Sequence, residues 1–330
     1  MVVVTAAFIG AAATSRAQTT PPLPCDSPVV DFLGCPRDPT QQARFAQLYR
    51  LGTFNMAGGN KGHGDNAETA VALAKSITGR GIDFLFLQET CQRMTDRLQE
   101  DLAPKGYKVE FIPTESKCIR RTPRKHRRDR RDRKGSPYGI GIVYRSFRSV
   151  FTRKPRVYSL PSELVRRGEI KRLERRKMVC LKVFYPRRIV ACSTHLTANS
   201  GRDRDKNRLE QTEKIAAILA AEAADGWAIL LGGDFNMKPE NPSLDPLWDP
   251  LYGGAAHGDF LEVDSGPSTE KDDYHRDGGE TTHGGIFGKK KIDYIFVHGV
   301  AVLNADVGRS KFSDHRPLWA EVLSPAQQPN

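Results

Sequence analysis

The sequence predicts an α/β protein in which two β-sheets pack face to face and helices cover their outer faces. Short apolar runs typical of buried strands alternate with segments of helical periodicity, and several runs are separated only by turn residues, as in hairpins. A simple parallel array of strands and helices would not contain these hairpins. Because 38% of the 330 residues are hydrophobic, the chain can bury a large core. We expect one domain over residues 41–324 and a short tail at 325–330.

The first half of this domain alternates between strands and helices. Asn66 is a candidate helix cap and Gly79 a candidate helix end, which together bound one amphipathic segment. In chain order we predict a short helical turn at 41–49, a strand at 49–55, a helix at 66–79, a strand at 82–88, a helix at 94–102, and strands at 107–112 and 138–145, the last two separated by a loop.

The second half contains a hairpin, a long helix and a buried strand before its longest loop. The apolar run Ile229-Leu230-Leu231 predicts a strand that ends at Gly232-Gly233. Long loops in a compact domain commonly carry function. The other predicted elements are strands at 177–185 and 189–194, a helix at 209–224, a loop at 238–288, and strands at 291–297 and 318–323.

The N-terminus is typical of an exported protein. Residues 1–17 contain an apolar run that is too short to span a bilayer, followed by small residues, so we predict a signal peptide. The Pro-rich residues 18–40 predict an irregular arm. Six cysteines without a Cys-x-x-Cys spacing favour disulfides over a thiolate zinc site. Spacing leaves about 15 connectivities open; the arrangement we favour pairs Cys25 with Cys35, Cys91 with Cys118 and Cys180 with Cys192.

Two basic segments carry the formal net charge of +12. Residues 120–134 contain ten Lys or Arg and two Asp, residues 166–177 contain seven Lys or Arg and two Glu, and the remainder of the chain has a net charge of −1. Such concentrated charge favours a polyanionic partner, which nucleic acid, acidic lipid and acidic glycan all satisfy, although solvated loops would also have this composition. The residues expected to contact substrate are Arg120, Arg121, Arg124, Lys125, Arg127 and Arg128.

Polar side chains with metal-binding or acid–base capacity adjoin several of the apolar runs. A single case, such as Asp234 and Asn236 after a strand, is also typical of a turn in which Asp and Asn bind their own backbone. A whole set of carboxylates, amides and imidazoles at strand ends instead predicts a hard-cation site surrounded by acid–base groups. The set comprises Asn55, Glu89, His195, Asp234, Asn236, Asp293, Asp314 and His315.

Six short motifs resemble the endonuclease/exonuclease/phosphatase superfamily, which has the deoxyribonuclease-I-like fold. They are TFNM at 53–56, LQET at 87–90, STHL at 193–196, GDFN at 233–236, KIDYIF at 291–296 and SDHRP at 313–317, and they occur in the family's order. The resemblance implies a four-layered α/β sandwich with two mainly antiparallel or mixed sheets. It also implies hydrolysis of phosphoesters with a divalent cation. We expect Mg²⁺, while Mn²⁺ and Ca²⁺ also suit hard oxygen ligands.

The resemblance also implies a role for each site residue. Asn55, Glu89 and Asp314 match metal-side residues. Asp234 matches the group that orients or deprotonates water, Asn236 a donor to phosphate oxygen, and His195 a histidine near the leaving group. His315 matches the second catalytic histidine, and Asp293 the carboxylate that holds its ring. The division of acid and base roles between the two histidines stays open.

One expected partner is missing from the sequence. In deoxyribonuclease-like members a glutamate near the strand that matches residues 138–145 contacts the STHL histidine, but residues 135–138 are Gly-Ser-Pro-Tyr. The resemblance therefore leaves His195 without an identified carboxylate partner, which puts its role as a general acid in doubt.

The favoured hypothesis is a secreted, monomeric, metal-dependent endonuclease that hydrolyses DNA, with RNA as a further candidate substrate. The alternatives are a secreted sphingomyelinase or other phospholipid phosphodiesterase, another phosphatase of the superfamily, and a non-catalytic polyanion-binding protein. We expect no stable membrane insertion, because the sequence has no exposed aromatic hairpin suited to it.

Overall fold

The computed structural model describes residues 46–59, 64–119, 134–146, 154–166, 169–184, 187–265, 274–276, 279–285 and 288–324. The predicted signal peptide, the arm, the tail and the Cys25–Cys35 pair lie outside the described residues. So do residues 120–133, which include all six basic residues expected to contact substrate.

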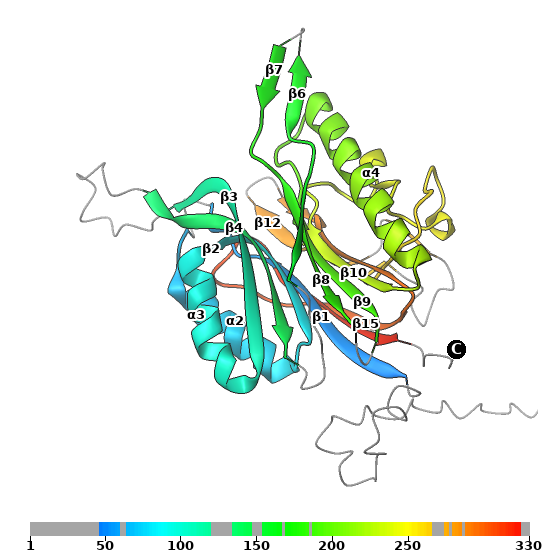
Figure 1. The fold of residues 1–330 in the computed structure, drawn as a ribbon. Helices are drawn as coiled ribbons and strands as arrows, with labels where there is room; N and C mark the ends of the chain where they lie inside the picture. Colours follow the sequence, from blue (N-terminus) through cyan, green and yellow to red (C-terminus); the bar gives the residue numbers. More distant parts are fainter. Residues whose placement is uncertain are drawn as a thin grey trace, which may run out of the picture.

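Two six-stranded sheets form the centre of the molecule (Figure 1). The first sheet has the strand order β15-β16-β1-β2-β4-β3 and the second β11-β14-β10-β9-β8-β5. Each is mixed, because β1–β2 and β9–β10 are parallel and the other pairs antiparallel. The first sheet comprises β1 (Gln47–Asn55), β2 (Phe84–Cys91), β3 (Tyr107–Ile119), β4 (Lys134–Arg145), β15 (Ala301–Val307) and β16 (Leu318–Ser324). The second comprises β5 (Arg156–Ser159), β8 (Lys177–Val183), β9 (Ile189–His195), β10 (Ala228–Asp234), β11 (Leu261–Glu262) and β14 (Asp293–His298).

In the described part of the chain, three α-helices complete the four layers. Helices α2 (Ala67–Arg80) and α3 (Gln92–Leu102) lie on the outer face of the first sheet, and α4 (Arg202–Ala224) lies on the outer face of the second (Figure 1). One apolar cluster fills the space between the sheets, and one lies under each helical layer. The predicted four-layered α/β sandwich is therefore confirmed.

Helix α2 begins as predicted but ends two residues later. The Asn66 side chain accepts a hydrogen bond from the backbone N–H of Glu68, as an N-cap does. The helix passes through Gly79 and is closed by Gly81, whose φ of +63° belongs to the left-handed region. Gly81 ends the helix because its N–H then reaches two free carbonyls of the last turn.

Strand β10 does not stop at its two glycines, contrary to the sequence prediction. It continues through Gly232 and Gly233 to Asp234. A Cβ on Gly232 would lie 2.1 Å from Cδ2 of Phe86, which comes from β2 of the other sheet. Glycine at this position therefore lets the two sheets approach each other closely at the level of the site.

Other differences concern strand pairing that local patterns do not reveal. Gln47–Tyr49 extend β1 by pairing with β16, so they are not the predicted helical turn. Strand β4 begins at Lys134, where a loop was predicted. Two small hairpins also lie where no strand was predicted, and the first stands out from the sandwich near α4 (Figure 1). They are β6 (Glu163–Arg166) with β7 (Glu169–Arg172), and β12 (His283–Gly285) with β13 (Gly288–Lys290).

Two of the three predicted disulfides lie in described residues, and both are confirmed. Cys180 and Cys192 face each other across the β8–β9 pair. Cys91 and Cys118 join the end of β2 to β3. The second bond therefore ties the strand that carries Glu89 to the strand that leads into the basic segment.

Candidate active site

The register of the second sheet aligns three of the predicted residues in one row. Asp234, the last residue of β10, pairs with His195 on the parallel strand β9 and with Asp293 on the antiparallel strand β14. His195 and Asp293 therefore flank Asp234 on either side at one edge of the sheet.

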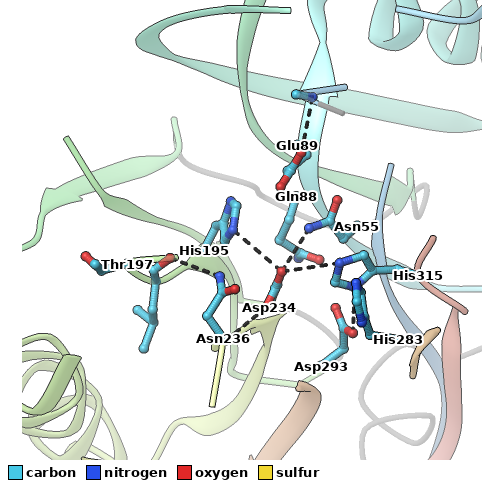
Figure 2. Close-up of polar contacts among 12 residues, drawn as sticks. Asn55, Gln88, Glu89, His195, Thr197, Asp234, Asn236, His283, Asp293 and His315 are labelled. Atoms are coloured by element: carbon cyan, nitrogen blue, oxygen red, sulfur yellow. Dashed lines mark hydrogen bonds and ion pairs between the residues drawn. The ribbon is translucent and has the colours of Figure 1, made fainter. Parts of the chain in front are cut away.

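Asn55 joins this row from the other sheet. It is the last residue of β1, and its side-chain Nδ2 donates to Asp234 Oδ2 at 2.9 Å (Figure 2). Its Oδ1 accepts from the backbone N–H of Ala57 at 2.9 Å. The amide is thus held at both ends and fixes the carboxylate of Asp234.

An irregularity in β2 sets the orientation of the Glu89 side chain. The pairing of β2 with β4 shifts register between Leu87 and Thr90, which is a β-bulge, and Glu89 has a φ of +47°. Bulges redirect side chains, and a left-handed non-glycine residue stores strain that functional sites commonly retain. Glu89 Oε2 accepts from the N–H of Gly59 at 3.1 Å. Figure 2 shows its carboxylate directed towards the other site residues.

Asp234 is the best-connected carboxylate of the cluster. Its Oδ1 accepts from the N–H of Asn236 at 2.8 Å, and its Oδ2 lies 3.6 Å from His195 Nε2 and 3.7 Å from His315 Nε2. Burial and the neighbouring Asp293 raise the pKa of Asp234 to about 7, against the opposing effect of His315. The group is therefore suited to accept a proton near neutral pH.

His315 is held by a carboxylate behind its ring. Its Nδ1 lies 2.8 Å from Asp293 Oδ2, and its backbone N–H donates to the hydroxyl of Ser313. Burial alone would lower the pKa of His315, but Asp293, followed by Asp234 and Glu89, raises it to about 10. The ring therefore carries a positive charge at neutral pH.

His195 has an arginine behind its ring instead. The Nη1 of Arg176 lies 3.0 Å from His195 Nδ1, and both side chains are buried. Burial, followed by the charges of Arg176 and His315, lowers the pKa of His195 well below its usual value. Arg176 was missed in the sequence because it lies in a run of basic residues that was interpreted as a polyanion-binding segment or a solvated loop.

Asn236 combines the turn conformation with a place in the site. Its φ of +55° and the bond from its N–H to Asp234 form the turn that is also typical of Asp and Asn after a strand. Its Nδ2 donates to the carbonyl of Leu196 at 3.2 Å (Figure 2). This bond leaves the second amide hydrogen of Asn236 for a ligand.

Asp314 and a further histidine lie beside His315. His283, on β12, stacks edge-on against the His315 ring with centroids 4.7 Å apart, and its Nε2 lies 3.7 Å from Asp314 Oδ2. The pKa of Asp314 is lowered to about 2: burial opposes this shift, and His283 and His315 drive it. The structure therefore brings all eight predicted residues into one region.

Several supporting residues were assigned no role from the sequence, although Gln88, Ser193 and Ser313 lie within the family motifs. Gln88 of β2 contacts the Ser193 hydroxyl of β9 at 3.3 Å and so bridges the sheets below the site. The Ser313 hydroxyl donates to the carbonyl of Asn55 at 2.8 Å. The Thr282 hydroxyl accepts from the N–H of Asp293 at 3.1 Å. These are ordinary polar residues whose role depends on contacts that the fold creates.

The donor set of the cluster suits a divalent cation. Enclosure raises the pKa of Glu89, which shows that its charge is incompletely compensated, although His315 and a hydrogen bond from Asn55 lower it. A cation would supply that compensation. Within the described residues, two sets of His, Asp and Glu side chains are compact enough to hold an ion, and neither contains Glu89: Asp234, Asp293 and His315, and His283, Asp314 and His315.

Comparison with solved structures shows the same fold in several proteins. The catalytic domain of human nocturnin, solved with a bound sulfate anion, has 17% identity and a TM-score of 0.59, covering 83% of this chain and 93% of that one. A mannosyl-6-phosphatase from Bacteroides thetaiotaomicron has 16% identity and a TM-score of 0.57, covering 83% and 99%. TDP2 from Caenorhabditis elegans has 15% identity and a TM-score of 0.56, covering 84% and 74%.

The sequence matches no curated protein. It does match the sequence model of a family over residues 52–315, which is most of the chain and contains every residue of the cluster from Asn55 to His315. The protein therefore belongs to the endonuclease/exonuclease/phosphatase family.

Proposed function

We propose that this protein is a secreted, divalent-metal-dependent nuclease that cleaves phosphodiester bonds within DNA, and also within RNA. Its family consists of phosphoester hydrolases that mostly depend on a metal. The observation that carries the proposal is the contact of Asp234 with Asn55 of the opposite sheet, between two histidines. This contact joins a proton acceptor, proton donors and hard oxygen ligands in one cluster.

In the proposed reaction Asp234 is the general base. Water attacks phosphorus and transfers a proton to Asp234, whose pKa of about 7 lets it accept that proton at neutral pH. Asn55 and the N–H of Asn236 hold the carboxylate in place. The second amide hydrogen of Asn236 is placed to bind a non-bridging phosphate oxygen.

Charge on the transition state is met by His315, and a bound cation would add to this stabilisation. Asp293 fixes the His315 ring and keeps it protonated, so its Nε2–H can stabilise the phosphorane and protonate the leaving oxygen. Asn55, Glu89 and Asp314 would hold the cation, which we propose is Mg²⁺, with Mn²⁺ or Ca²⁺ as substitutes. Such an ion supplies Lewis-acid stabilisation of phosphate oxygens.

The basic segment supports nucleic acid as the substrate. Strands β3 and β4 end on either side of residues 120–133. Next to the end of β3, Gly58 packs against the Cys91–Cys118 disulfide. A Cβ on Gly58 would lie 2.6 Å from Cys91 Sγ and 3.1 Å from Cys118 Sγ. Gly58 also donates its N–H to the Glu89 carbonyl. The chain therefore enters the basic segment beside the turn that holds Glu89, close to where a phosphate backbone would lie.

Export is part of the proposal, and the disulfides support it. Both described disulfides are of the kind that persists in oxidising compartments.

Within the described residues no helix is both long enough and apolar enough to cross a membrane.

Cleavage of supercoiled plasmid DNA tests the proposal. We expect nicking with Mg²⁺ and none after EDTA is added. Replacing Arg120, Arg121, Arg124, Lys125, Arg127 and Arg128 by glutamine should weaken DNA binding on the order of 100-fold and flatten its salt dependence, because fewer counterions are released. Slow Mg²⁺-dependent cleavage should remain, since the catalytic cluster is intact.

Assays on other substrates define the results that would contradict the nuclease proposal. Phosphocholine release from sphingomyelin vesicles without DNA cleavage would favour the phospholipid phosphodiesterase. Hydrolysis of a sugar phosphate alone would favour a phosphomonoesterase. DNA binding without turnover under any divalent ion would indicate a non-catalytic polyanion-binding protein.

A further inference from the structure

The two histidines of the cluster have opposite groups behind their rings. Asp293 lies 2.8 Å from Nδ1 of His315, whereas Arg176 lies 3.0 Å from Nδ1 of His195. In both cases Nε2 is the nitrogen that faces Asp234. The histidines therefore present the same nitrogen to the reaction but experience opposite charges at the other.

Arg176 is itself firmly held. Its Nη2 lies 3.2 Å from Glu174 Oε2, and its backbone N–H donates to the hydroxyl of Ser162 at 2.9 Å. Its backbone carbonyl accepts from Leu160 at 2.9 Å. With a side chain only 7% exposed, the guanidinium is fixed against the imidazole and is not a mobile surface charge.

The chemistry of arginine determines where the proton of His195 must lie. A guanidinium remains charged in proteins and has only hydrogen-bond donors. The nitrogen that faces it at hydrogen-bond distance must therefore be an acceptor, which places the proton of a neutral imidazole on the other nitrogen. His195 Nδ1 is thus unprotonated and Nε2 carries the hydrogen.

The Nε2–H of His195 is available for a ligand. The atom is buried and has no hydrogen-bond partner among the described residues, since Asp234 Oδ2 is 3.6 Å away. A buried donor without a partner costs free energy in the absence of ligand. An oxygen of a bound phosphoester would remove that cost.

We propose that Arg176 is a positioning residue that holds His195 as a neutral Nε2–H donor to the substrate phosphate, and so assigns proton transfer to His315. The inference rests on the proposed hydrolysis of phosphoesters. As the bond from phosphorus to the leaving oxygen breaks, that oxygen takes its proton from His315 Nε2, and the water proton goes to Asp234. His195 keeps its proton throughout, because losing it would leave an imidazolate anion.

The tautomer can be measured without substrate or metal by ¹⁵N NMR of the histidine side chains, with His195 assigned from its loss in His195→Gln. At neutral pH we expect the Nδ1 signal of an acceptor nitrogen and the Nε2 signal of a protonated one. Arg176→Met should produce a mixture of tautomers, and Arg176→Lys should retain the original one. His257, whose Nδ1 contacts the Ala255 carbonyl, serves as the unchanged control. A proton on Nδ1 of wild-type His195, alone or with one on Nε2, would overturn the proposal.

Steady-state kinetics give an independent test, because glutamine offers a neutral N–H but cannot act as an acid. His195→Ala should lower kcat on the order of 100-fold, the effect of losing one transition-state donor. The kcat of His195→Gln should fall much less, whereas the kcat of His315→Gln should fall severely. Arg176→Met should lower kcat with little change in KM, and Arg176→Lys should recover part of the loss. Equal impairment of His195→Gln and His195→Ala would contradict a donor role.

The two proposals fail in different ways. If the wild-type protein hydrolyses no phosphoester, the proposed function is wrong, yet the NMR spectrum still decides the tautomer that Arg176 imposes. If the protein is active and His195 is doubly protonated at neutral pH, only the role of Arg176 is wrong.

Discussion

Replacing Asp234 by asparagine is expected to lower kcat on the order of 1,000-fold, the effect of removing a general base. Asparagine keeps the shape of the side chain and its Oδ1 can still accept from the N–H of Asn236. It cannot take a proton from water. KM should change little, because phosphate binding is assigned to other groups.

Folding should survive this substitution. Burial and repulsion from Asp293 oppose the charge of Asp234, so removing that charge relieves a cost. The Nδ2 of the new asparagine faces the Nδ2 donor of Asn55, which offsets part of this relief. Thermal unfolding should therefore show a melting temperature within a few degrees of the wild type. Asp225→Asn, at the exposed end of α4, is the matched control and should retain full activity. A folded Asp234→Asn protein with near-normal kcat would exclude Asp234 as the base.

Glu89→Gln is expected to weaken activation by Mg²⁺ on the order of 100-fold or more, because losing even a group that supports a metal ligand costs 10- to 100-fold in affinity. Glutamine is isosteric and can still accept from the N–H of Gly59. The variant should therefore fold and keep its two described disulfides.

The measurement is the Mg²⁺ concentration that gives half-maximal activity, with Mn²⁺ titrated in parallel. Glu68→Gln provides the control, since Glu68 is an exposed residue in the first turn of α2. An unchanged Mg²⁺ requirement in Glu89→Gln would show that this carboxylate does not hold the ion.

The side chains of the candidate site could be predicted from the sequence because each follows or lies in an apolar strand. Once the strands pair in register, residues as distant as His195, Asp234 and Asp293 must meet at one sheet edge. Pairing itself was harder to predict. The β10 strand passes through Gly232, where the absence of a side chain lets Phe86 of the other sheet approach, and no local pattern contains that information.

The sequence could not predict the orientation of the site side chains or their electrostatic environment. The bulge at Glu89 and its positive φ depend on pairing with β4. Arg176 belongs to a basic run, and only the fold buries it against His195. The sequence showed that His195 lacks a carboxylate partner, but it did not show that the Arg176 guanidinium lies beside the ring instead.

The central claim is that side chains from both sheets surround one divalent ion at which a phosphoester is hydrolysed. A crystal structure of the protein with Mn²⁺, with data collected at the manganese absorption edge, tests it most directly. We predict an anomalous peak bonded to Glu89 and adjoining Asn55 and Asp314, beside Asp234 and His315. A fully occupied manganese site elsewhere, with none at Glu89, would contradict the account.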